Sequence, residues 1–443
     1  MISPVVLILA AGEGKRMNSS LPKVLHSLAG KPMLSHLLTT VKQLKPKKTI
    51  VVFGHQAKKV KETFRDSKVT WVLQKKQKGT ADAVLSASRV LLGSKGPLFI
   101  LYGDVPLLRI ETLRQMQRSF YQEKATLTFL TTFVKNPTSY GRIIRNTAGE
   151  VIRIVEEKDA TAEEKKVCEV NSGLYLVDCQ EVLKGVREIE KSLVTGEYYL
   201  TDLIEQFLRK GKKVVSVVAD DSQECLGINS RLELARAESQ LRRRINESWM
   251  ARGVTMRNPD SISIDADVML ERDVQIHQGV VVTGKSRIHK GAEILPYSVI
   301  EESEIKSFAR IGPFAHLRPG SVVGEGGHVG NFVELKKARL MKGVKANHLS
   351  YLGDTVIGEG TNVGAGTITC NYDGFKKHKT VIGKNVFIGS DVQFVAPVKV
   401  ENGAWIAAGT TVTKKVPRDS LAITRVEQKN INGWVKRRKR SRH

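Results

Sequence analysis

The sequence predicts two domains of different class, an α/β domain with a mostly parallel sheet and then a parallel β-helix, joined by a helical linker. Two patterns support this prediction. Apolar strands alternate with segments of helical length up to about residue 226, and an aliphatic residue recurs every six positions beyond residue 254. The 443 residues suffice for two or three domains of about 150 residues each. We therefore expect domains at residues 1–228 and 254–443 and a linker at residues 229–253.

The first domain contains four apolar or β-branched runs, at residues 5–9, 49–53, 98–102 and 127–133. Segments long enough to form helices separate these runs. Strands that alternate with helices in this way favour a Rossmann-like, doubly wound sheet with helices on both faces.

The linker has the start signal and the periodicity of one long helix. Ser230 and Glu233 have the spacing of a capping box, in which each side chain accepts a hydrogen bond from the other residue's backbone N–H. Apolar residues then recur at helical spacing from Leu234 to Trp249, and the arginines at 242–244 occupy the other faces.

The second domain is periodic at six residues, which is typical of a parallel β-helix of hexapeptide repeats. Each hexapeptide supplies one short strand, three strands make a triangular coil, and stacked coils bury the aliphatic residues on the axis. A β-sandwich has strands of period two and would not keep a six-residue register through four runs. The runs are Val268, Val274 and Val280; Ile288, Ile294 and Ile300; Ile305, Ile311, Leu317, Val323, Val329 and Leu335; and Ile382, Ile388, Phe394, Val400, Ile406 and Val412.

Two segments depart from this repeat. The polar stretch CNYDGFKKHKTV at residues 370–381 interrupts it, and loops that project from a rigid scaffold are frequent positions of functional sites. After residue 412 the repeat ends, and six cations close the chain between Lys436 and Arg442. We interpret this charged end as a solvated tail.

Composition restricts the class of protein and of partner. The chain has 71 Lys and Arg against 45 Asp and Glu, and the formal charge of +26 fits either nucleic acid or small phosphorylated substrates. No recognisable nucleic-acid module accompanies the charge, so we expect no nucleic-acid partner. The most apolar early stretch, residues 4–11, is far shorter than the roughly 20 residues of a membrane span, so we expect a cytoplasmic protein. Four cysteines without a Cys-x-x-Cys pair predict neither a disulfide framework nor a zinc site.

A glycine-rich turn, LAAGEGKRM at residues 9–17, follows the first predicted strand. The backbone N–H groups of such a turn approach phosphates closely, and Arg16 and Lys23 add the two cations that phosphoryl or nucleotidyl transfer requires. The spacing matches neither the Walker pattern nor the dinucleotide GxGxxG pattern. At this point Arg16 and Lys23 could also be ordinary surface cations of a basic protein.

His348 is the candidate base of the second domain. It lies in NHLSY, among cations and amides that suit a sugar phosphate. An imidazole titrates near neutral pH and can therefore take the proton of an amine that is being acetylated. The competing interpretation is a hydrogen-bonded structural histidine.

The motifs of both halves resemble those of known enzymes. LAAGEGKRM, LPKVLH, GTADAV, YGDVPLL, YGRIIR, EVNSGLY and GEYYLTDLIE closely resemble the sugar-nucleotide pyrophosphorylases. NHLSYLGD and NVGAGTITCNYDG make the whole chain similar to the bifunctional bacterial N-acetylglucosamine-1-phosphate uridyltransferase/glucosamine-1-phosphate N-acetyltransferase family. The resemblance covers nearly all residues.

The resemblance implies a bifunctional cytoplasmic enzyme that makes UDP-N-acetylglucosamine, a precursor of peptidoglycan and lipopolysaccharide. The second domain, a left-handed β-helix, would acetylate glucosamine 1-phosphate with acetyl-CoA. The first domain, of nucleotidyltransferase type, would then transfer UMP from UTP to N-acetylglucosamine 1-phosphate and release pyrophosphate, with Mg²⁺ as cofactor. The resembling proteins are trimers with the acetyl-CoA site at the subunit boundary, so the resemblance also implies a homotrimer.

In the first domain the resemblance assigns three tasks. Arg16 and Lys23 would contact the phosphates during transfer, and Asp104 and Asn229 would bind Mg²⁺. Asn229 would also contact the nucleotide sugar. The other contacts would be Leu9, Ala10, Ala11, Gly12 and Tyr102 to the nucleotide, Gln74, Gly79 and Thr80 to the uracil edge, and Gly141, Glu156 and Asn171 to the N-acetyl sugar.

In the second domain the resemblance makes His348 the catalytic base. The sugar phosphate would be bound by Arg318, Lys336, Tyr351, Asn362 and Lys377. Asn371 would contact both the sugar and acetyl-CoA. The other contacts to acetyl-CoA would be Tyr372, Ala365, Ser390, Ala408 and Arg425.

Two alternatives keep parts of this interpretation. A single-function sugar-nucleotide pyrophosphorylase with a structural β-helix, as in ADP-glucose pyrophosphorylases, is disfavoured by the His348 cluster and the CNYDG insertion. A non-enzymatic regulatory or exchange-factor subunit, as in translation initiation, is disfavoured by Arg16, Lys23, Asp104 and Asn229.

Overall fold

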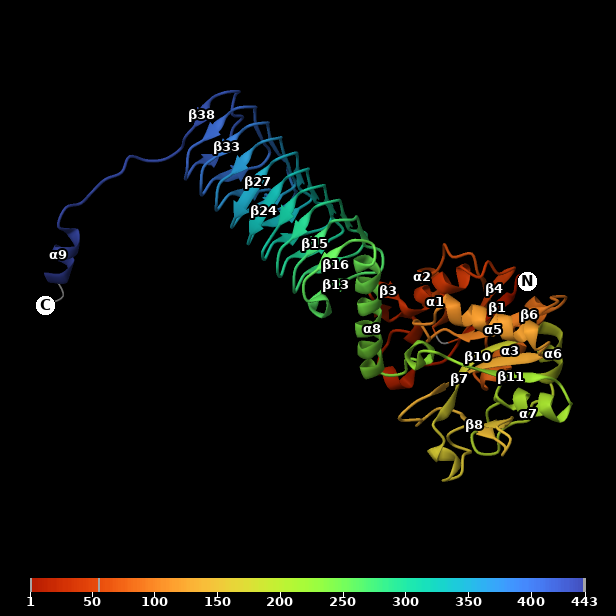
Figure 1. Ribbon diagram of the computed structural model, residues 1–443. Helices are drawn as coiled ribbons and strands as arrows, with labels where there is room; N and C mark the ends of the chain where they lie inside the picture. Colours follow the sequence, from red (N-terminus) through yellow and green to blue (C-terminus); the bar gives the residue numbers. More distant parts are fainter. Residues whose placement is uncertain (1, 55, 441–443) are drawn as a thin grey trace. The chain divides into compact units, whose positions relative to one another are not determined.

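The computed structural model describes residues 2–54 and 56–440, and the chain divides into two compact units, Met1–Leu241 and Arg242–His443 (Figure 1). The division falls within helix α8 (Arg231–Met250). Each unit has its own hydrophobic core. Within the described ranges, no helix combines the length and the apolar character that crossing a membrane requires.

A nine-stranded sheet forms the centre of the first unit. Seven strands lie in the order β11-β7-β10-β6-β1-β4-β5, and β8 and β9 attach through β10. The strands are β1 (Val5–Ala10), β4 (Lys48–Phe53), β5 (Thr70–Leu73), β6 (Pro97–Tyr102), β7 (Leu127–Phe133), β8 (Arg142–Arg145), β9 (Val151–Val155), β10 (Glu169–Asp178) and β11 (Val214–Val218). A separate hairpin joins β2 (Ser27–Leu28) to β3 (Lys31–Pro32).

Most neighbouring strands of this sheet are parallel. β1 pairs in parallel with both β4 and β6, β4 with β5, and β7 with β11. Strand β10 is the exception, because it runs antiparallel between β6 and β7. The four predicted runs correspond to β1, β4, β6 and β7, so the prediction of a mostly parallel α/β sheet is confirmed.

Helices cover both faces of the sheet. Val5, Leu7 and Leu9 of β1 pack in a core with α3, α6 and α7, whereas Val6 and Ile8 pack in a core with α1, α2 and α5. This alternation follows from the two-residue period of a strand. The helices are α1 (Met33–Lys42), α2 (Ala57–Thr63), α3 (Thr80–Ser86), α4 (Ser88–Leu91), α5 (Ile110–Gln122), α6 (Cys179–Gly185) and α7 (Asp202–Arg209).

The predicted capping box opens helix α8. The backbone N–H of Glu233 donates to Ser230 Oγ at 3.2 Å, and the N–H of Ser230 donates to Glu233 Oε2 at 3.0 Å. The N–H of Asn229 donates to the same carboxylate at 2.6 Å. The capping box therefore also fixes the backbone of Asn229 at the start of the helix.

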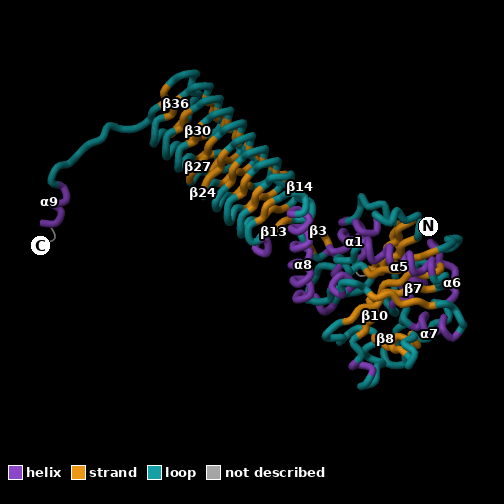
Figure 2. The backbone as a smooth tube through the Cα atoms, viewed as in Figure 1, coloured by secondary structure: helices purple, strands orange, loops and turns teal. Residues whose placement is uncertain are grey.

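Three parallel sheets form the β-helix of the second unit (Figure 2). The first contains β12 (Thr255–Met256), β15 (Gln275–Ile276), β18 (Glu293–Ile294), β21 (Arg310–Ile311), β24 (His328–Asn331), β27 (Lys345–His348), β30 (Asn362–Val363), β33 (Phe387–Ile388), β36 (Trp405–Ile406) and β38 (Leu421–Ala422). The second contains β13 (Ser263–Ile264), β16 (Val281–Thr283), β19 (Val299–Glu301), β22 (His316–Leu317), β25 (Glu334–Lys336), β28 (Tyr351–Gly353), β31 (Ile368–Cys370), β34 (Gln393–Val395) and β37 (Thr411–Val412). The third contains β14 (Met269–Leu270), β17 (Arg287–Ile288), β20 (Glu304–Ile305), β23 (Val322–Val323), β26 (Arg339–Leu340), β29 (Thr355–Ile357), β32 (Thr380–Ile382) and β35 (Val398–Val400).

The register of these sheets confirms the hexapeptide repeat. Gln275 pairs with Glu293, which is one coil of three hexapeptides. Every aliphatic residue predicted to lie on the axis is buried in the core of this unit. The coil between Asn362 and its partner Phe387 is longer than the others. The extra residues are the predicted insertion, and residues 371–379 form a loop between β31 and β32.

The remaining predictions concern cysteines and the end of the chain. Cys168, Cys179, Cys225 and Cys370 are free thiols, as expected. The basic end forms a short exposed helix, α9 (Trp434–Arg440), whereas the last cation of the predicted run lies outside the described residues.

Candidate functional site

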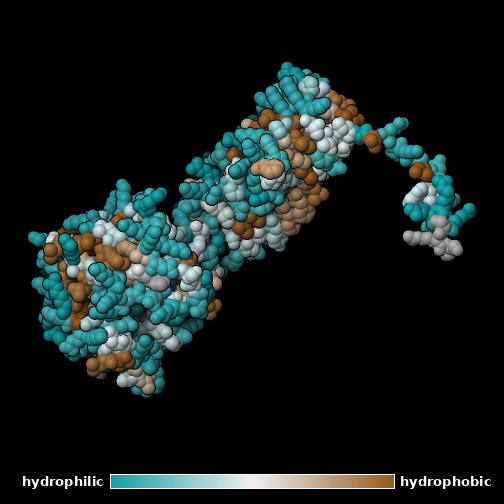
Figure 3. Space-filling model, turned by 180° about the vertical axis from the view of Figure 1, so that it is seen from behind, coloured by the Kyte–Doolittle hydropathy of each residue, from teal (hydrophilic) through white to brown (hydrophobic). Residues whose placement is uncertain are grey.

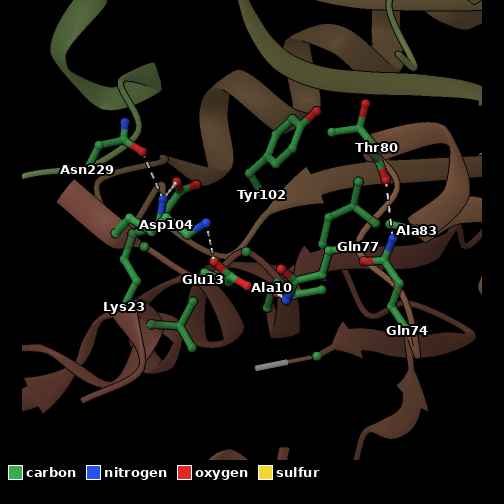
Figure 4. Close-up of a pocket in the computed structure, with 18 of the residues that line it drawn as sticks. Ala10, Glu13, Lys23, Gln74, Gln77, Thr80, Ala83, Tyr102, Asp104 and Asn229 are labelled. Carbon is green, nitrogen blue, oxygen red and sulfur yellow. Dashed lines mark hydrogen bonds and ion pairs between the residues drawn. The ribbon is translucent and has the colours of Figure 1, made fainter. Parts of the chain in front are cut away.

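A cavity of about 1150 Å³ opens at the carboxyl ends of β1, β4, β5 and β6 (Figure 4). The carboxyl ends of neighbouring parallel strands meet at one edge of a sheet, so the loops that follow these strands share the cavity. The predicted residues that line it are Leu9, Ala10, Ala11, Gly12, Arg16, Lys23, Gln74, Gly79, Thr80, Tyr102, Asp104 and Asn229.

The glycine-rich turn forms one wall of this cavity. Gly14 has a φ of 67°, in the left-handed region that glycine adopts without strain, and a 3₁₀ turn at Lys15–Met17 follows it. A Cβ atom at Gly14 would also lie 2.8 Å from Lys23 Cβ. The glycine therefore allows the turn to approach Lys23, and Arg16 lines the cavity from the same turn.

Lys23 connects the two predicted metal ligands. Its ammonium group donates hydrogen bonds to Asp104 Oδ2 and to Asn229 Oδ1, the latter at 3.0 Å (Figure 4). A cation therefore lies between a carboxylate oxygen and an amide oxygen. Mg²⁺ prefers oxygen ligands of these kinds. Among the described side chains, no group of three or more His, Cys, Asp and Glu residues could hold a metal. Asp104 and Asn229 would thus supply only part of a metal's coordination, and substrate oxygens or water would supply the rest.

Gly141, Glu156 and Asn171 do not line this cavity, but they lie close to one another. The N–H of Asn171 donates to the Gly141 carbonyl at 2.8 Å, and a Cβ atom at Gly141 would lie 3.5 Å from the Glu156 carboxylate. Burial raises the pKa of Glu156, although the Thr201 hydroxyl donates a hydrogen bond to its carboxylate at 3.0 Å. These residues form a compact polar group that suits the hydroxyl and amide groups of a sugar.

Tyr102 links this polar group to the cavity. Burial raises its pKa, and the nearby charge of Glu156 raises it further, so the phenol stays protonated. Gly173 packs against its ring with a φ of 77°, and a Cβ atom there would clash with the ring. The position of Tyr102 therefore depends on glycine at residue 173.

Several residues of the cavity carry no assignment from the sequence, among them Lys75, Gln77 and Glu197. Lys75 and Gln77 come from the loop after β5, and Glu197 comes from the GEYYLTDLIE segment. Gln77 Nε2 donates to the Ala11 carbonyl, so it joins two loops of the wall. The motif around Glu197 is a signal that could have pointed to it, whereas the contact of Gln77 is visible only in three dimensions.

In the second unit, the register of the first sheet places predicted acyl-transfer residues in one column. Asn331 pairs directly with His348. In the following coils, Lys345 pairs with Asn362, Asn362 with Phe387, and Phe387 with Trp405. The residue three positions after each of these therefore lies in the same column as His348. From one end to the other the column is Asn331, His348, Ala365, Ser390 and Ala408.

This column is long enough for an extended ligand. Adjacent strands lie about 4.8 Å apart, so His348 and Ala408 are separated by about 14 Å along it. Arg425 follows the next coil, whose Leu421 pairs with Trp405, and its side chain is exposed. The predicted acetyl-CoA contacts at Ala365, Ser390, Ala408 and Arg425 therefore succeed one another away from His348.

The environment of His348 suits a general base. Its Nδ1 lies 3.1 Å from Asn331 Oδ1, and an amide oxygen only accepts hydrogen bonds. In the neutral imidazole the proton is therefore on Nδ1, and the lone pair lies on Nε2. Sequence reasoning missed Asn331, because its partner lies 17 residues away and meets it only through the coil.

Three cations meet on the second sheet and the insertion. The nearby Lys377 ammonium lowers the pKa of Lys336, and Arg318 lowers it further. Arg318 Nη1 donates to Glu334 Oε1 at 2.8 Å. Like charges this close repel each other unless an anion lies between them, so the cluster favours a phosphate.

Tyr351 and Asn371 meet above a glycine in the same region. A Cβ atom at Gly353 would lie 2.5 Å from Tyr351 Oη and 2.8 Å from Asn371 Nδ2. Asn371 Nδ2 also donates to Asp354 Oδ2 at 2.6 Å. Asn362 lies in the adjacent coil of the first sheet, beside the strand of His348.

An acid orders the insertion that carries Tyr372 and Lys377. Asp373 accepts hydrogen bonds from the backbone N–H groups of Phe375 at 2.8 Å and Lys376 at 2.6 Å, and from His378 Nε2 at 2.6 Å. The N–H of Lys376 and then the His378 side chain hold the pKa of Asp373 well below its usual range. Sequence reasoning assigned Asp373 no role, although an Asp–Gly pair is a turn signal.

Two family models match the chain. The model described as nucleotidyl transferase matches residues 5–251, and the one described as bacterial transferase hexapeptide (six repeats) matches residues 379–414. The first matches more than half of the chain, and the second lies within the β-helix.

Curated relatives match along nearly the full length. A protein named bifunctional protein GlmU from Caldanaerobacter subterraneus subsp. tengcongensis is 45% identical over 98% of both chains. Proteins of the same name from Caldicellulosiruptor saccharolyticus and Geobacter sulfurreducens are 43% and 44% identical, covering 98% of this chain and 97% and 98% of their own.

Gly173→Ala tests the position of Tyr102. The substitution places a Cβ atom against the Tyr102 ring and forces a positive φ on alanine, at a cost of about 1–3 kcal/mol. We expect a lower melting temperature and, at a temperature where the variant is folded, UTP binding weakened at least tenfold by calorimetric titration. Gly149→Ala is the control, because Gly149 also has a positive φ but a Cβ atom there would meet no other atom within 4 Å. Equal UTP affinity in the two variants would contradict the role given to Tyr102.

Asp373→Ala tests the order of the insertion. A carboxyl group whose pKa is lowered in the folded state stabilises that state above its unfolded pKa, and this stabilisation is lost as the pH falls through the folded value. At pH 7 we therefore expect the variant to lose hydrogen-exchange protection in residues 371–379. Glucosamine 1-phosphate binding should weaken several-fold, because Lys377 is no longer held. Glu359→Ala serves as control, and unchanged exchange in the insertion of Asp373→Ala would refute the role of Asp373.

Proposed function

The chain belongs to the family of the bifunctional GlmU proteins, and from this premise we propose how its two sites divide the reactions. The protein is a transferase with two activities in the synthesis of UDP-N-acetylglucosamine. One activity is glucosamine-1-phosphate N-acetyltransfer, and the other is uridylyl transfer to N-acetylglucosamine 1-phosphate. The observation that carries the assignment of residues is the presence of one built site in each half of the chain.

We assign uridylyl transfer to the cavity of the first unit. An oxygen of the sugar phosphate attacks the α-phosphorus of UTP, the bond from that phosphorus to the bridging oxygen breaks, and pyrophosphate leaves. Such a transfer needs charge stabilisation more than proton transfer. Arg16 and Lys23 are placed to supply it, because both line the cavity beside the glycine-rich turn.

Asp104 and Asn229 are the proposed ligands of Mg²⁺, and their oxygens fit that ion. The reactions of this family are generally metal-dependent. When bound, Mg²⁺ would neutralise charge on the phosphates. Lys23 donates hydrogen bonds to the same two side chains, so its ammonium group would have to move toward the phosphates when the ion binds.

The sugar and base are proposed to bind on either side of Tyr102. Glu156, Gly141 and Asn171 present a buried carboxyl group, backbone groups and an amide to the N-acetyl sugar. Gln74 and the Gly79–Thr80 segment bind the uracil edge. Gly79 is the residue that this position requires, because a Cβ atom there would clash with the backbone of Tyr198.

We assign acetyl transfer to the β-helix, with His348 as the base. The neutral amine of glucosamine 1-phosphate attacks the thioester carbonyl, the carbon–sulfur bond breaks, and coenzyme A leaves as a thiolate that receives the amine proton through His348. Nε2 of His348 takes the amine proton. The hydrogen bond from Nδ1–H to Asn331 Oδ1 leaves the lone pair of Nε2 for this task.

The substrates of acetyl transfer would approach His348 from two directions. Arg318, Lys336 and Lys377 bind the phosphate, and Tyr351, Asn362 and Asn371 bind the sugar. Acetyl-CoA would extend along the column from Ala365 past Ser390 and Ala408 to Arg425, with Asn371 and Tyr372 at its acetyl end. Arg425 at the far end of the column supports this direction, because the nucleotide end of the cofactor is its anionic end.

We propose that the protein is a homotrimer in the cytoplasm. Hydrophobic side chains reach the surface along the β-helix (Figure 3). Tyr297, Phe314 and Phe332 stack with ring centroids 5.4 Å and 5.5 Å apart, and Leu349, next to His348, continues this ladder. About half of each ring is exposed, which favours burial against a second copy of the chain.

The alternative of a single-function pyrophosphorylase with a structural β-helix does not fit relatives that match nearly the full chain and are named bifunctional. It requires no chemistry near residue 348. The cations around Lys336 also argue against it, because a purely structural β-helix has no need of a cluster that suits a phosphate.

Two substitutions test the division of the reactions. We expect His348→Ala to lower acetyl transfer at least a hundredfold and to leave uridylyl transfer unchanged, since it removes only the base. Asp104→Ala should do the reverse, because it removes a metal ligand and the partner of Lys23. Both activities are measured on the same folded preparations. If either substitution abolished both activities, the two sites would not be independent.

Phe332→Glu tests the trimer. We expect sedimentation equilibrium of the natural protein to give the mass of three chains and the variant to dissociate, because a charge replaces an apolar ring in the ladder. Val381→Glu is the matched control, since Val381 is exposed on the third sheet, away from the ladder. Acetyl transfer should fall with dissociation while uridylyl transfer persists. A monomeric natural protein with full acetyltransferase activity would exclude the proposed assembly.

A further inference from the structure

We propose that three exposed lysines of the loop that borders the nucleotide cavity, Lys75 in its lining and Lys76 and Lys78 beside it, attract the triphosphate of UTP and speed its association. We call them the rim lysines. This inference rests on the proposed uridylyl transfer and adds residues to which neither the sequence nor the family resemblance gives a role. It also accounts for part of the chain's excess positive charge.

The loop of the rim lysines is held against the cavity. It connects β5 to α3, and both Lys75 and Gln77 line the cavity wall. Gln77 Nε2 donates to the Ala11 carbonyl, and the N–H of Tyr198 donates to the Lys78 carbonyl at 2.9 Å. Figure 4 shows Gln74 and Gln77 at this wall. These two hydrogen bonds hold the backbone of the loop beside the cavity, so the lysines that it carries stay near the cavity.

The rim lysines differ from the cations deeper in the site. Lys23 is neutralised by Asp104, and Lys15 pairs with Glu13 at 2.9 Å. All three rim lysines are exposed, and within the described ranges none forms an ion pair with a carboxylate. Glu197 lines the cavity and offsets one charge, so the mouth remains net positive.

Neighbouring loops extend the same positive surface. Lys58 and Lys59 lie exposed at the start of α2, after the carboxyl end of β4, and Arg16 follows β1. Cations thus follow three adjacent parallel strands at the edge that holds the cavity. Clefts lined by one sign of charge raise the association rates of oppositely charged ligands by about 10- to 1000-fold.

The opposite edge of the same sheet provides a matched comparison. Lys42, Lys45 and Lys47 are exposed and precede β4, whereas Gly54 at the other end of β4 lines the cavity. A strand of this length spans about 20 Å. At about 0.1 M salt that is roughly two Debye lengths, so these three charges are largely screened from the cavity. We call them the far-edge lysines.

The competing explanation is a solvated surface with no effect on catalysis. The two explanations differ in how the rate depends on salt and on substrate charge. Attraction by charge weakens as salt is added, and it acts more strongly on a triphosphate than on the monophosphate of N-acetylglucosamine 1-phosphate. Loss of a direct contact would instead persist at high salt.

Three variants of the full chain test the proposal: K75Q/K76Q/K78Q, K75R/K76R/K78R and K42Q/K45Q/K47Q. At about 0.1 M salt we expect the rim glutamine variant to lose about 3- to 10-fold in kcat/KM for UTP, with kcat unchanged and a flatter dependence on salt. Its KM for N-acetylglucosamine 1-phosphate should change less. The rim arginine variant should retain the natural values, and the far-edge variant should stay within about 1.5-fold of them.

Two results would overturn the proposal. One is equal behaviour of the rim and far-edge glutamine variants, and the other is a loss in the rim variant that is the same at about 0.1 M and 0.5 M salt. Melting temperature and acetyl transfer report whether each variant is folded. If the natural protein itself failed to transfer UMP, the proposed function would be wrong, and calorimetric titration of UTP into the same variants would still test the rim lysines.

Discussion

Parallel strand pairing in a fixed register is the constraint on which both sites depend. In the first unit it brings the carboxyl ends of β1, β4, β5 and β6 to one edge, where a single cavity receives their loops. In the second unit it aligns residues one coil apart, so that Asn331 lies beside His348 and later coils extend the same column. A slip of one residue would turn these side chains toward the core. The buried aliphatic residues prevent that slip, so the core and the sites are set by the same register.

Both units also contain clusters of positively charged side chains. Lys336 lies close enough to Lys377 for its pKa to be lowered, and the lysines of the loop beside the first cavity lack carboxylate partners in the described ranges. Such arrangements leave positive charge available to a ligand, because carboxylates of the chain do not neutralise all of it. They become favourable when a phosphate binds between them. Lys23 is different, because Asp104 and Asn229 hold its charge before any substrate arrives.

Much of the fold could be predicted, because its main signals are local or strictly periodic. The six-residue period identified the axis of the β-helix, and the Ser230–Glu233 pair identified the start of a helix. The direction of β10 was not predicted, since pairing between strands distant in sequence leaves no local signal. For the sites, the resemblance supplied residues that line the first cavity, but Gln77, Asn331 and Asp373 had no signal of function. Their roles come from a contact between two loops, a pairing between coils and the turn of an insertion.

The sequence by itself determined the class of both halves, the residues buried on the β-helix axis and the motifs of the two activities. The first two properties follow from apolar residues that recur at a regular spacing, and the third follows from the chemistry of the motif side chains. Both can be read directly from the order of the residues. Only the tertiary structure decided which charges are neutralised and which remain available to an anion. That distinction depends on distances between residues far apart in sequence, such as Lys23 and Asn229. Amino-acid composition contains no information about these distances. The excess of positive charge is one number in the sequence, but in the fold it separates into paired cations, clustered phosphate sites and an exposed rim.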